Sequence, residues 1–354
     1  MIKIEYYVIG VMSGTSLDGL DLAYIKFTFI ESWEFKIEYV DTVSYNTVWK
    51  KRLQDLITFN SEELKQVDAD YTLLLSKMIK AFIQRNKIKR IDAICSHGHT
   101  ALHQPESGVT YQIGNQSSLA RLINQKVVCD FRVQDVEYGG QGAPLVPIGD
   151  RLLFPEYNYC LNLGGFANIS TEINSKRIAY DICAVNTVLN YYVASLGFDY
   201  DDKGIIAASG IVNKELLNQL NALDFFKRSY PKSLGLEWVK AQVFPCIKSF
   251  NLEIEDILRT FVEHIAVQIS NEINKKNNAS VLITGGGVFN TFLMQRIRAL
   301  SINEIVIPSE DIINYKEALI FGFLGVLKLR DEVNCLKSVT GASQDHSSGI
   351  IYLP

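Results

Sequence analysis

The chain has 354 residues, of which 47% are hydrophobic and 21% charged, a composition typical of folded globular proteins and not of disordered ones. At roughly 150 residues per domain, this length predicts about two domains. The 35 basic and 39 acidic side chains leave a net charge of −4, so there is no basic excess with which to bind nucleic-acid phosphates.

The six cysteines are widely spaced, with no CxxC pair and no zinc-finger spacing. We therefore expect buried, reduced thiols, as in a cytoplasmic protein. The apolar run near the start, residues 6–12, is far too short to span a membrane. We expect neither a membrane nor a nucleic acid among the partners.

The first half of the chain opens with a predicted hairpin. Residues 6–12 have the pattern of a buried strand, residues 13–19 form a turn rich in small polar side chains, and residues 20–29 resume a strand pattern. Residues 91–95 and 127–131 are further predicted strands, with a predicted helix over 119–123 between them. A cluster of glycine and proline over 139–147 fits a domain boundary or a functional loop equally well.

The second half repeats this outline. Residues 159–163 predict a strand that ends in Gly164 and Gly165, with two more predicted strands over 166–173 and 177–181. Apolar residues recur every four positions over 256–273, which indicates an amphipathic helix. The buried strand over 281–284 then runs into a triple-glycine turn, and a helix is expected from about Asn290.

Two α/β lobes, each opened by a glycine-tipped hairpin, are typical of the actin/hexokinase-like (ribonuclease H-like) fold, with ATP in a cleft between the lobes. We expect residues 1–150 to form the first lobe and residues 151–354 the second, with the C-terminal tail packing back on the first.

The glycine-tipped segments are the candidate phosphate contacts. No Walker sequence and no complete GxGxxG motif is present. Glycines allow backbone N–H groups to approach a phosphate closely, and hydroxyl groups add donors. An ordinary hairpin turn explains the first segment equally well. The candidate ATP residues are Gly14, Thr15, Ser16, Leu17, Asp18, Gly19, Leu20, Asp21, Gly164, Gly165, Asn168, Gly285, Gly286 and Gly287, with Asp18 also a candidate Mg²⁺ ligand.

Three side chains at strand ends are candidates for the chemistry. His97 is expected to hydrogen-bond a substrate. A metal site begun by His97 and His99 would need more ligands from other strand ends, and the only histidines outside residues 97–103 are His264 and His346. Asp181 is a candidate general base, or alternatively the N-cap of a helix that begins near Val185. Arg132 could bind a carboxylate or phosphate, pair with Asp130, or be a solvated arginine.

Several blocks along the chain resemble the anhydro-N-acetylmuramic acid kinases. The opening block is GVMSGTSLDGLD over 10–21, and a second long block is GGQGAPLVP over 139–147. Shorter blocks follow in the same order as in that family: SHGHT at 96–100, QIG at 112–114, DFR at 130–132, NLGGFAN at 162–168, PKS at 231–233, GGG at 285–287, KEA at 316–318 and SVTGA at 338–342.

The resemblance implies a cytoplasmic enzyme of bacterial cell-wall recycling. Such enzymes hydrolyse the 1,6-anhydro bridge of anhydro-N-acetylmuramic acid and phosphorylate O6 with ATP and Mg²⁺, giving N-acetylmuramic acid 6-phosphate. Asp181 then corresponds to the aspartate that activates water. The implied sugar-contacting residues are His97, Thr100, Arg132, Gln141, Asn186 and Glu317, the implied partner is a small amino sugar, and a homodimer is an open alternative to a monomer.

One stretch departs from the family pattern. Around the aspartate the family usually has Phe-Asp-Thr-Gly-Pro-Gly-Asn, whereas residues 180–186 here are Tyr-Asp-Ile-Cys-Ala-Val-Asn. The departure keeps open two alternatives: a kinase for a different amino sugar, and a catalytically weak ATP-binding protein that senses a sugar.

Overall fold

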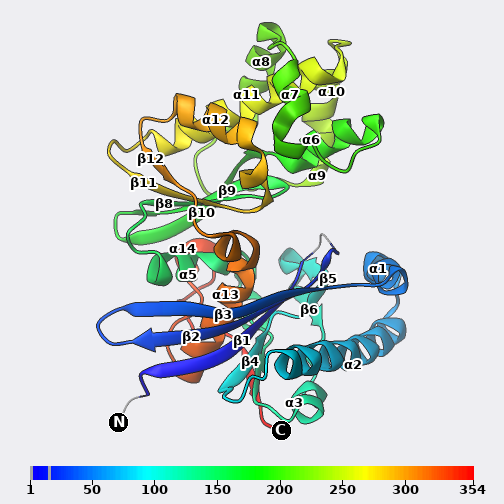
Figure 1. Ribbon diagram of the computed structural model, residues 1–354, viewed down its shortest axis with the longest axis vertical. Helices are drawn as coiled ribbons and strands as arrows, with labels where there is room; N and C mark the ends of the chain where they lie inside the picture. Colours follow the sequence, from blue (N-terminus) through cyan, green and yellow to red (C-terminus); the bar gives the residue numbers. More distant parts are fainter. Residues whose placement is uncertain (1–2, 15–16) are drawn as a thin grey trace. The chain divides into compact units, whose positions relative to one another are not determined.

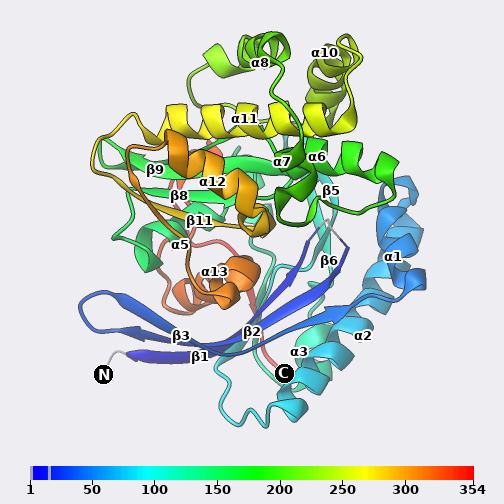
Figure 2. The ribbon, with the colours of Figure 1, turned by 45° about the horizontal axis from the view of Figure 1, so that its top comes forward.

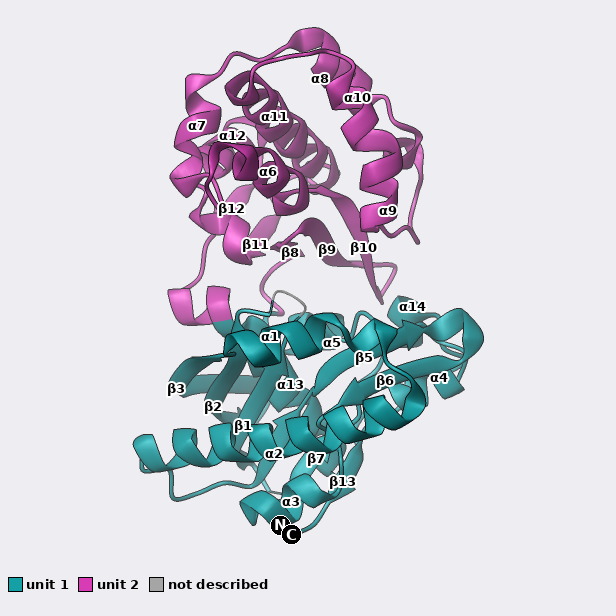
Figure 3. Ribbon diagram, turned by 90° about the vertical axis from the view of Figure 1, so that its right-hand side faces the viewer, with its two compact units in different colours: residues 1–154, 315–354 teal, residues 155–314 magenta. Residues whose placement is uncertain are grey.

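A computed structural model describes residues 3–14 and 17–354 (Figure 1). The described chain divides into two compact units, residues 1–154 with 315–354 and residues 155–314 (Figure 3). The first boundary lies near the expected one at 150. Residues 315–354, expected in the second lobe apart from a returning tail, group with the first unit.

Unit 1 is built on a mixed sheet of order β13-β7-β4-β1-β2-β3. Strands β1, β2 and β3 are antiparallel neighbours, whereas β4 and β7 continue from β1 in parallel. A separate hairpin joins β5 to β6. The strands are β1 (Glu5–Ser13), β2 (Gly19–Phe29), β3 (Trp33–Ser44), β4 (Ala93–Ser96), β5 (His99–Gln104), β6 (Val109–Ile113), β7 (Val127–Cys129) and β13 (Ile350–Tyr352).

Helices cover both faces of the unit 1 sheet. Successive side chains of a strand point to opposite faces, so apolar side chains on both faces are buried against helices. Ile9 and Val11 share a core with Leu75 of α2, while Gly10 contacts Ala318 of α13 on the opposite face. The helices are α1 (Thr47–Gln54), α2 (Ser61–Arg85), α3 (Ser118–Ile123), α4 (Val133–Glu137), α5 (Val146–Leu153), α13 (Glu310–Leu329) and α14 (Lys337–Thr340). The first five residues of α13 belong to unit 2.

Unit 2 repeats the strand arrangement with the order β10-β9-β8-β11-β12. Its first three strands are antiparallel and the next two parallel, as in unit 1 without β13. The strands are β8 (Tyr159–Leu163), β9 (Phe166–Ile173), β10 (Lys176–Ala184), β11 (Ser280–Thr284) and β12 (Glu304–Val306). This repeated strand order is that of ribonuclease H-like lobes and confirms the predicted actin/hexokinase-like fold class.

The helices of unit 2 pack around the long helix α11, above the sheet in Figure 2. Ile257, Phe261, Ile265, Ile269 and Ile273, the residues that predicted an amphipathic helix, are buried in one core with the strands. The helices are α6 (Asn186–Val193), α7 (Ile205–Ser209), α8 (Lys214–Asn221), α9 (Leu236–Trp238), α10 (Phe244–Lys248), α11 (Ile254–Ile273) and α12 (Thr291–Leu300). No helix among the described residues is long and apolar enough to cross a membrane.

Candidate active site

The β1–β2 hairpin of unit 1 carries the first candidate ATP segment. Thr15 and Ser16 lie outside the described residues. Leu17 has a left-handed backbone with φ +60°, and its N–H donates to the Gly14 carbonyl at 3.4 Å. The Leu20 side chain is buried in the core, so only its backbone is available to a ligand.

In this segment the charge of one carboxylate affects the pKa of another. Asp18 is exposed just before β2, and Asp21 lies within β2, where its Oδ1 accepts a hydrogen bond of 2.7 Å from Thr42 Oγ1. Burial raises the pKa of Asp21 above its usual value, the hydrogen bond from Thr42 opposes this, and the charge of Asp18 raises the pKa further. A bound cation would relieve this repulsion, and carboxylate oxygens are the ligands that Mg²⁺ prefers. The residues therefore fit the expected ion.

A buried hydrogen-bond network supports the base of the hairpin. Ser13 Oγ lies 2.8 Å from His99 Nδ1 and accepts a hydrogen bond of 2.8 Å from Tyr45 OH, which lies 2.6 Å from Tyr71 OH. Burial lowers the pKa of His99 to about 4, so the ring is neutral near pH 7. Sequence reasoning missed Ser13 and Tyr45. For Ser13, the only signal in the sequence was its position in the opening block.

His97 and Arg132 are brought together in unit 1. Arg132 Nε donates to His97 Nε2 at 2.9 Å, and Arg132 Nη1 donates to the Gly142 carbonyl at 2.6 Å. His97 Nδ1 lies 2.9 Å from the Gly98 carbonyl, so this nitrogen carries the proton. Burial holds the pKa of His97 well below its usual value. His97 is thus a neutral residue that positions Arg132, and the alternative Asp130–Arg132 pair does not form between these described residues.

The other candidate sugar contacts of unit 1 lie on different elements. Thr100 is half-buried in β5, opposite Gln112 of β6. Gln141 has an exposed side chain, and its N–H donates to the Thr340 carbonyl at 2.8 Å. Glu317 of α13 reaches solvent, yet the surrounding protein raises the pKa of its carboxyl group, an effect that the charge of Arg132 opposes.

In unit 2 a polar row crosses the sheet at the ends of four strands. Thr284 of β11 is in register with Asn162 of β8, Asn162 with Asn168 of β9, and Asn168 with Asp181 of β10. Directly paired residues present their side chains on one face, at neighbouring positions. The row unites the candidate base with one candidate ATP residue, and it adds Asn162, which sequence reasoning missed.

Asp181 lies where β10 carries a register irregularity, between Asp181 and Cys183. Its Oδ2 accepts a hydrogen bond of 2.8 Å from Leu234 N–H, and its own N–H donates to the Lys232 carbonyl at 3.2 Å. Among the described residues no donor hydrogen-bonds to Oδ1. Burial raises the pKa of Asp181, whereas the Leu234 bond and the charge of Lys232 lower it.

The residues that depart from the family pattern are part of the core of unit 2. Ile182, Cys183, Ala184 and Val185 are all at most 2% exposed and belong to the central apolar cluster. Described non-glycine residues with positive φ do not include any of these four. None of the four therefore adopts the left-handed backbone that favours glycine. Helix α6 begins at Asn186 with Val185 as its N-cap, so the alternative of Asp181 as an N-cap is wrong.

The glycine turns of unit 2 divide into packed and open positions. The Gly164 carbonyl lies 3.4 Å from Asn186 N–H, and the Gly165 carbonyl accepts from Val185 N–H at 2.8 Å. A Cβ at Gly285 would lie 2.5 Å from Asn162 Oδ1, and one at Gly287 would lie 2.7 Å from Leu163 Cβ. A Cβ at Gly286 would meet nothing within 4 Å. Gly286 is thus the open position of the triple-glycine turn.

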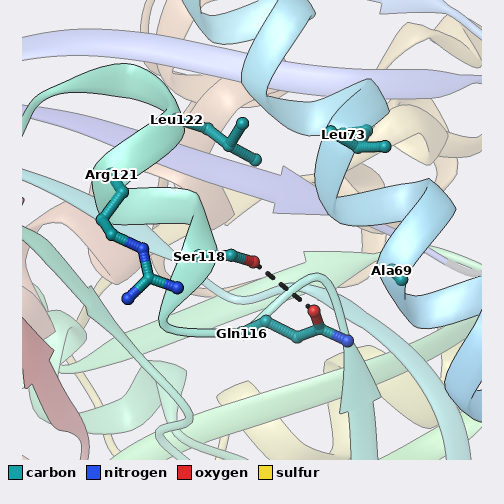
Figure 4. A pocket seen from close by; sticks show the side chains of 6 residues that line it. All are labelled: Ala69, Leu73, Gln116, Ser118, Arg121 and Leu122. Carbon is teal, nitrogen blue, oxygen red and sulfur yellow. Dashed lines mark hydrogen bonds between the residues drawn. The ribbon is translucent and has the colours of Figure 1, made fainter.

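A shallow cavity of about 340 Å³ lies elsewhere on unit 1, between α2 and α3 (Figure 4). The residues that line it are Ala69, Leu73, Gln116, Ser118, Arg121 and Leu122. Ser118 Oγ donates to Gln116 Oε1 across it at 3.4 Å. None of the candidate site residues lines this cavity, so the cavity is not part of the candidate active site.

Comparisons with known proteins identify the family. The model of the family "Anhydro-N-acetylmuramic acid kinase" matches residues 6–354. Relatives of that name from Sulfurimonas denitrificans and Mannheimia succiniciproducens are 33% and 34% identical, and each alignment covers 98% of this chain and 99% of the relative. A solved xylulose kinase from Lactobacillus acidophilus is similar at a TM-score of 0.46 and 13% identity, covering 99% of this chain and 94% of that one. The chain belongs to the anhydro-N-acetylmuramic acid kinase family.

Proposed function

We propose that this protein is a cytoplasmic ATP-dependent kinase that opens the 1,6-anhydro bridge of anhydro-N-acetylmuramic acid and phosphorylates O6. The product is N-acetylmuramic acid 6-phosphate. The family match over nearly the whole chain carries this proposal. It favours this activity over the two alternatives kept open above, a kinase for another amino sugar and a sugar sensor.

Asp181 is the proposed general base. As water attacks C1 of the sugar, the C1–O6 bond breaks, a C1–O bond to the water oxygen forms, and Asp181 takes a proton from the water. The released O6 attacks the γ-phosphorus of ATP, and ADP leaves. The position of Asp181 in a row of polar side chains and its raised pKa support this role, because an efficient base has a pKa closer to the working pH than an exposed aspartate has.

The glycine-tipped hairpin of each unit and the open Gly286 are the proposed ATP contacts. Asp18, assisted by Asp21, would hold Mg²⁺, which supplies positive charge to the phosphate oxygens. Arg132, whose guanidinium group is held by His97, is the proposed partner of the sugar's carboxylate, since a guanidinium group pairs well with a carboxylate.

ADP release with a panel of sugars tests the proposal. The panel is anhydro-N-acetylmuramic acid, N-acetylmuramic acid, N-acetylglucosamine and buffer without sugar. We expect rapid ADP formation only with the anhydro sugar, and a product mass that shows addition of both water and phosphate. Faster turnover of another amino sugar would establish the first alternative, and ATP binding with no turnover of any sugar would establish the second.

A further inference from the structure

A buried cluster of three metal-ligating side chains lies in unit 1. Asp135 comes from α4, while Cys335 and His346 come from the C-terminal segment. One candidate ligand atom from each lies within 4.8 Å of the other two. The three residues are 0%, 1% and 6% exposed, respectively. The cluster does not include His97 or His99, the histidines that the sequence singled out.

The backbone fixes two of these residues relative to each other. Cys335 and His346 form an isolated antiparallel bridge, in which each N–H donates to the other's carbonyl at 3.1 Å. Their side chains are therefore held in place independently of any bond between the side chains themselves.

His346 is the member whose hydrogen bonding is incomplete. Its Nδ1 lies 3.1 Å from the Gln344 carbonyl, so this nitrogen is the donor. Its buried Nε2 has no hydrogen-bond partner among the described residues and lies 3.6 Å from Asp135 Oδ1. In the neutral ring Nε2 carries a lone pair, and a lone pair facing a carboxylate is repulsive. A cation between the two groups would relieve this repulsion.

Hydrogen bonds from the surrounding residues hold the Asp135 carboxylate in place. Thr340 Oγ1 donates to Asp135 Oδ1 at 2.7 Å, and Gly142 N–H donates to Asp135 Oδ2 at 2.7 Å. Metal-bound carboxylates are usually held by such outer hydrogen bonds, and metal-bound histidines usually donate their other N–H to a carbonyl, as His346 does to Gln344. The Cys335 thiol donates to Asp135 Oδ1 at 3.0 Å, so the third candidate ligand is also in place.

We propose that Asp135, Cys335 and His346 bind a structural Zn²⁺ ion. One thiolate, one imidazole and one carboxylate form a donor set that suits zinc, with a water completing a tetrahedron. On binding, the Cys335 thiol loses its proton to solvent and His346 binds as the neutral ring. The charges of thiolate and carboxylate then balance that of the ion, which favours burial of the whole group.

The site anchors the loop that carries a candidate sugar contact. Asp135 holds Gly142, and Gly142 in turn accepts the hydrogen bond from Arg132. The neighbouring Gln141 is bonded through its N–H to Thr340. A metal at Asp135 therefore connects this loop to the C-terminal segment. Asp135 and Cys335 are 200 residues apart, so no spacing rule could have found the site.

Metal binding by the full-length protein tests this proposal. The protein is stripped with a chelator, its fold is checked by circular dichroism, and Zn²⁺ is titrated against a chromophoric competitor. We expect about one tightly bound Zn²⁺ per chain and a higher unfolding temperature with zinc, since a ligand of the folded state alone stabilises it. Co²⁺ as a probe should give thiolate-to-cobalt charge-transfer absorption.

Matched variants assign the ligands. Cys335→Ser and His346→Gln should each weaken zinc binding by more than the ~10–100-fold typical of losing an outer partner. Cys335→His should still bind Co²⁺ but lose the thiolate absorption.

Two control variants change residues outside the cluster: Cys129→Ser replaces another buried thiol, and His103→Gln replaces an exposed histidine. Both should leave the zinc affinity and the Co²⁺ absorption unchanged. A folded parent protein that binds neither Zn²⁺ nor Co²⁺ would overturn the proposal. Unchanged zinc affinity in both Cys335→Ser and His346→Gln would also overturn it.

Discussion

At Asp181, burial and polar contacts act on the same carboxyl group in opposite directions. Burial raises its pKa, while Leu234 N–H and the Lys232 charge lower it. Asp181→Asn keeps the shape of the side chain and its ability to accept from Leu234, but it cannot take a proton. We expect turnover to fall by about 10²–10⁴-fold, the usual contribution of a general base, with near-normal binding of ATP and sugar.

Steady-state kinetics and calorimetric titration of the Asp181→Asn protein measure these two effects separately. The comparison variant is Asp18→Asn, which should weaken binding of Mg-ATP because Asp18 is the proposed metal ligand. If Asp181→Asn keeps turnover while Asp18→Asn abolishes it with Mg-ATP binding intact, Asp18 is the base instead.

The charge of Lys232 gives a prediction of pH dependence. A base works only when deprotonated, so kcat/KM should fall as the pH drops through the pKa of Asp181. The Lys232 side chain is 5% exposed, and its positive charge lowers the pKa of Asp181. Lys232→Met removes that charge at similar length, so the acid limb of the profile should move to higher pH.

Lys275→Met is the matched control for this experiment. Lys275 also pairs with Glu272, the ion-pair partner of Lys232, but it does not contribute to the pKa of Asp181. The acid limb of the kcat/KM profile should therefore stay at the same pH in the Lys275→Met protein. An unmoved limb in the Lys232→Met protein, or equal movement in both variants, would show that Asp181 is not the group that titrates.

At the scale of elements, β1 and α13 approach each other too closely for any side chain at Gly10. A Cβ there would lie 1.9 Å from the Ala318 carbonyl oxygen and 3.2 Å from Gly322 N. Both contacts are with backbone atoms, so neither can be relieved by rotating a side chain. Gly10→Ala should lower the free energy of unfolding by about 1–3 kcal/mol or more, in the range of overpacked cores, as measured by urea denaturation.

Gly286→Ala is the informative partner of that substitution. The position is open and its φ is not in the left-handed region, so the free energy of unfolding should stay within about 0.5 kcal/mol. If Gly286 faces the nucleotide, the same methyl group should raise the KM for ATP. Loss of stability without any change in KM would remove Gly286 from the ATP site.

Local sequence patterns located several strands but missed others, including β3, β5 and β6, and they did not show how the sites are built. Alternating or continuous apolar runs gave β8 and β9 at their observed bounds, and β1 and β11 to within one residue at each end. The strand predicted over 127–131 ends earlier, at Cys129, because Asp130 adopts a left-handed backbone with φ +63°. No pattern within one element could show that the His97 nitrogens are both occupied, since their partners come from residues 98 and 132.

The cluster 139–147 illustrates the same limit. Its glycines and prolines fitted a boundary or a functional loop, and the observed boundary lies further on, after Phe154. What fixes the loop is Asp135, whose carboxylate accepts from Gly142 N–H and from Thr340 Oγ1. That contact joins segments about 200 residues apart, so it follows only from the tertiary structure.

For the whole molecule, the two compact units are connected at two places in the chain, after Phe154 and within α13 before Tyr315. Kinases that transfer phosphate to a small substrate benefit from excluding water, because water competes with the substrate hydroxyl for the γ-phosphate.

Binding of ATP and sugar together should therefore bring the units into a more compact arrangement. The Asp181→Asn protein should bind both natural substrates and turn them over only slowly, which makes it the right material for this test. Solution scattering should give a smaller radius of gyration for that complex than for the free protein, with ATP alone or sugar alone producing less of the change. Superimposable scattering curves for the free and doubly bound protein, at concentrations where calorimetry shows both ligands bound, would rule out such closure.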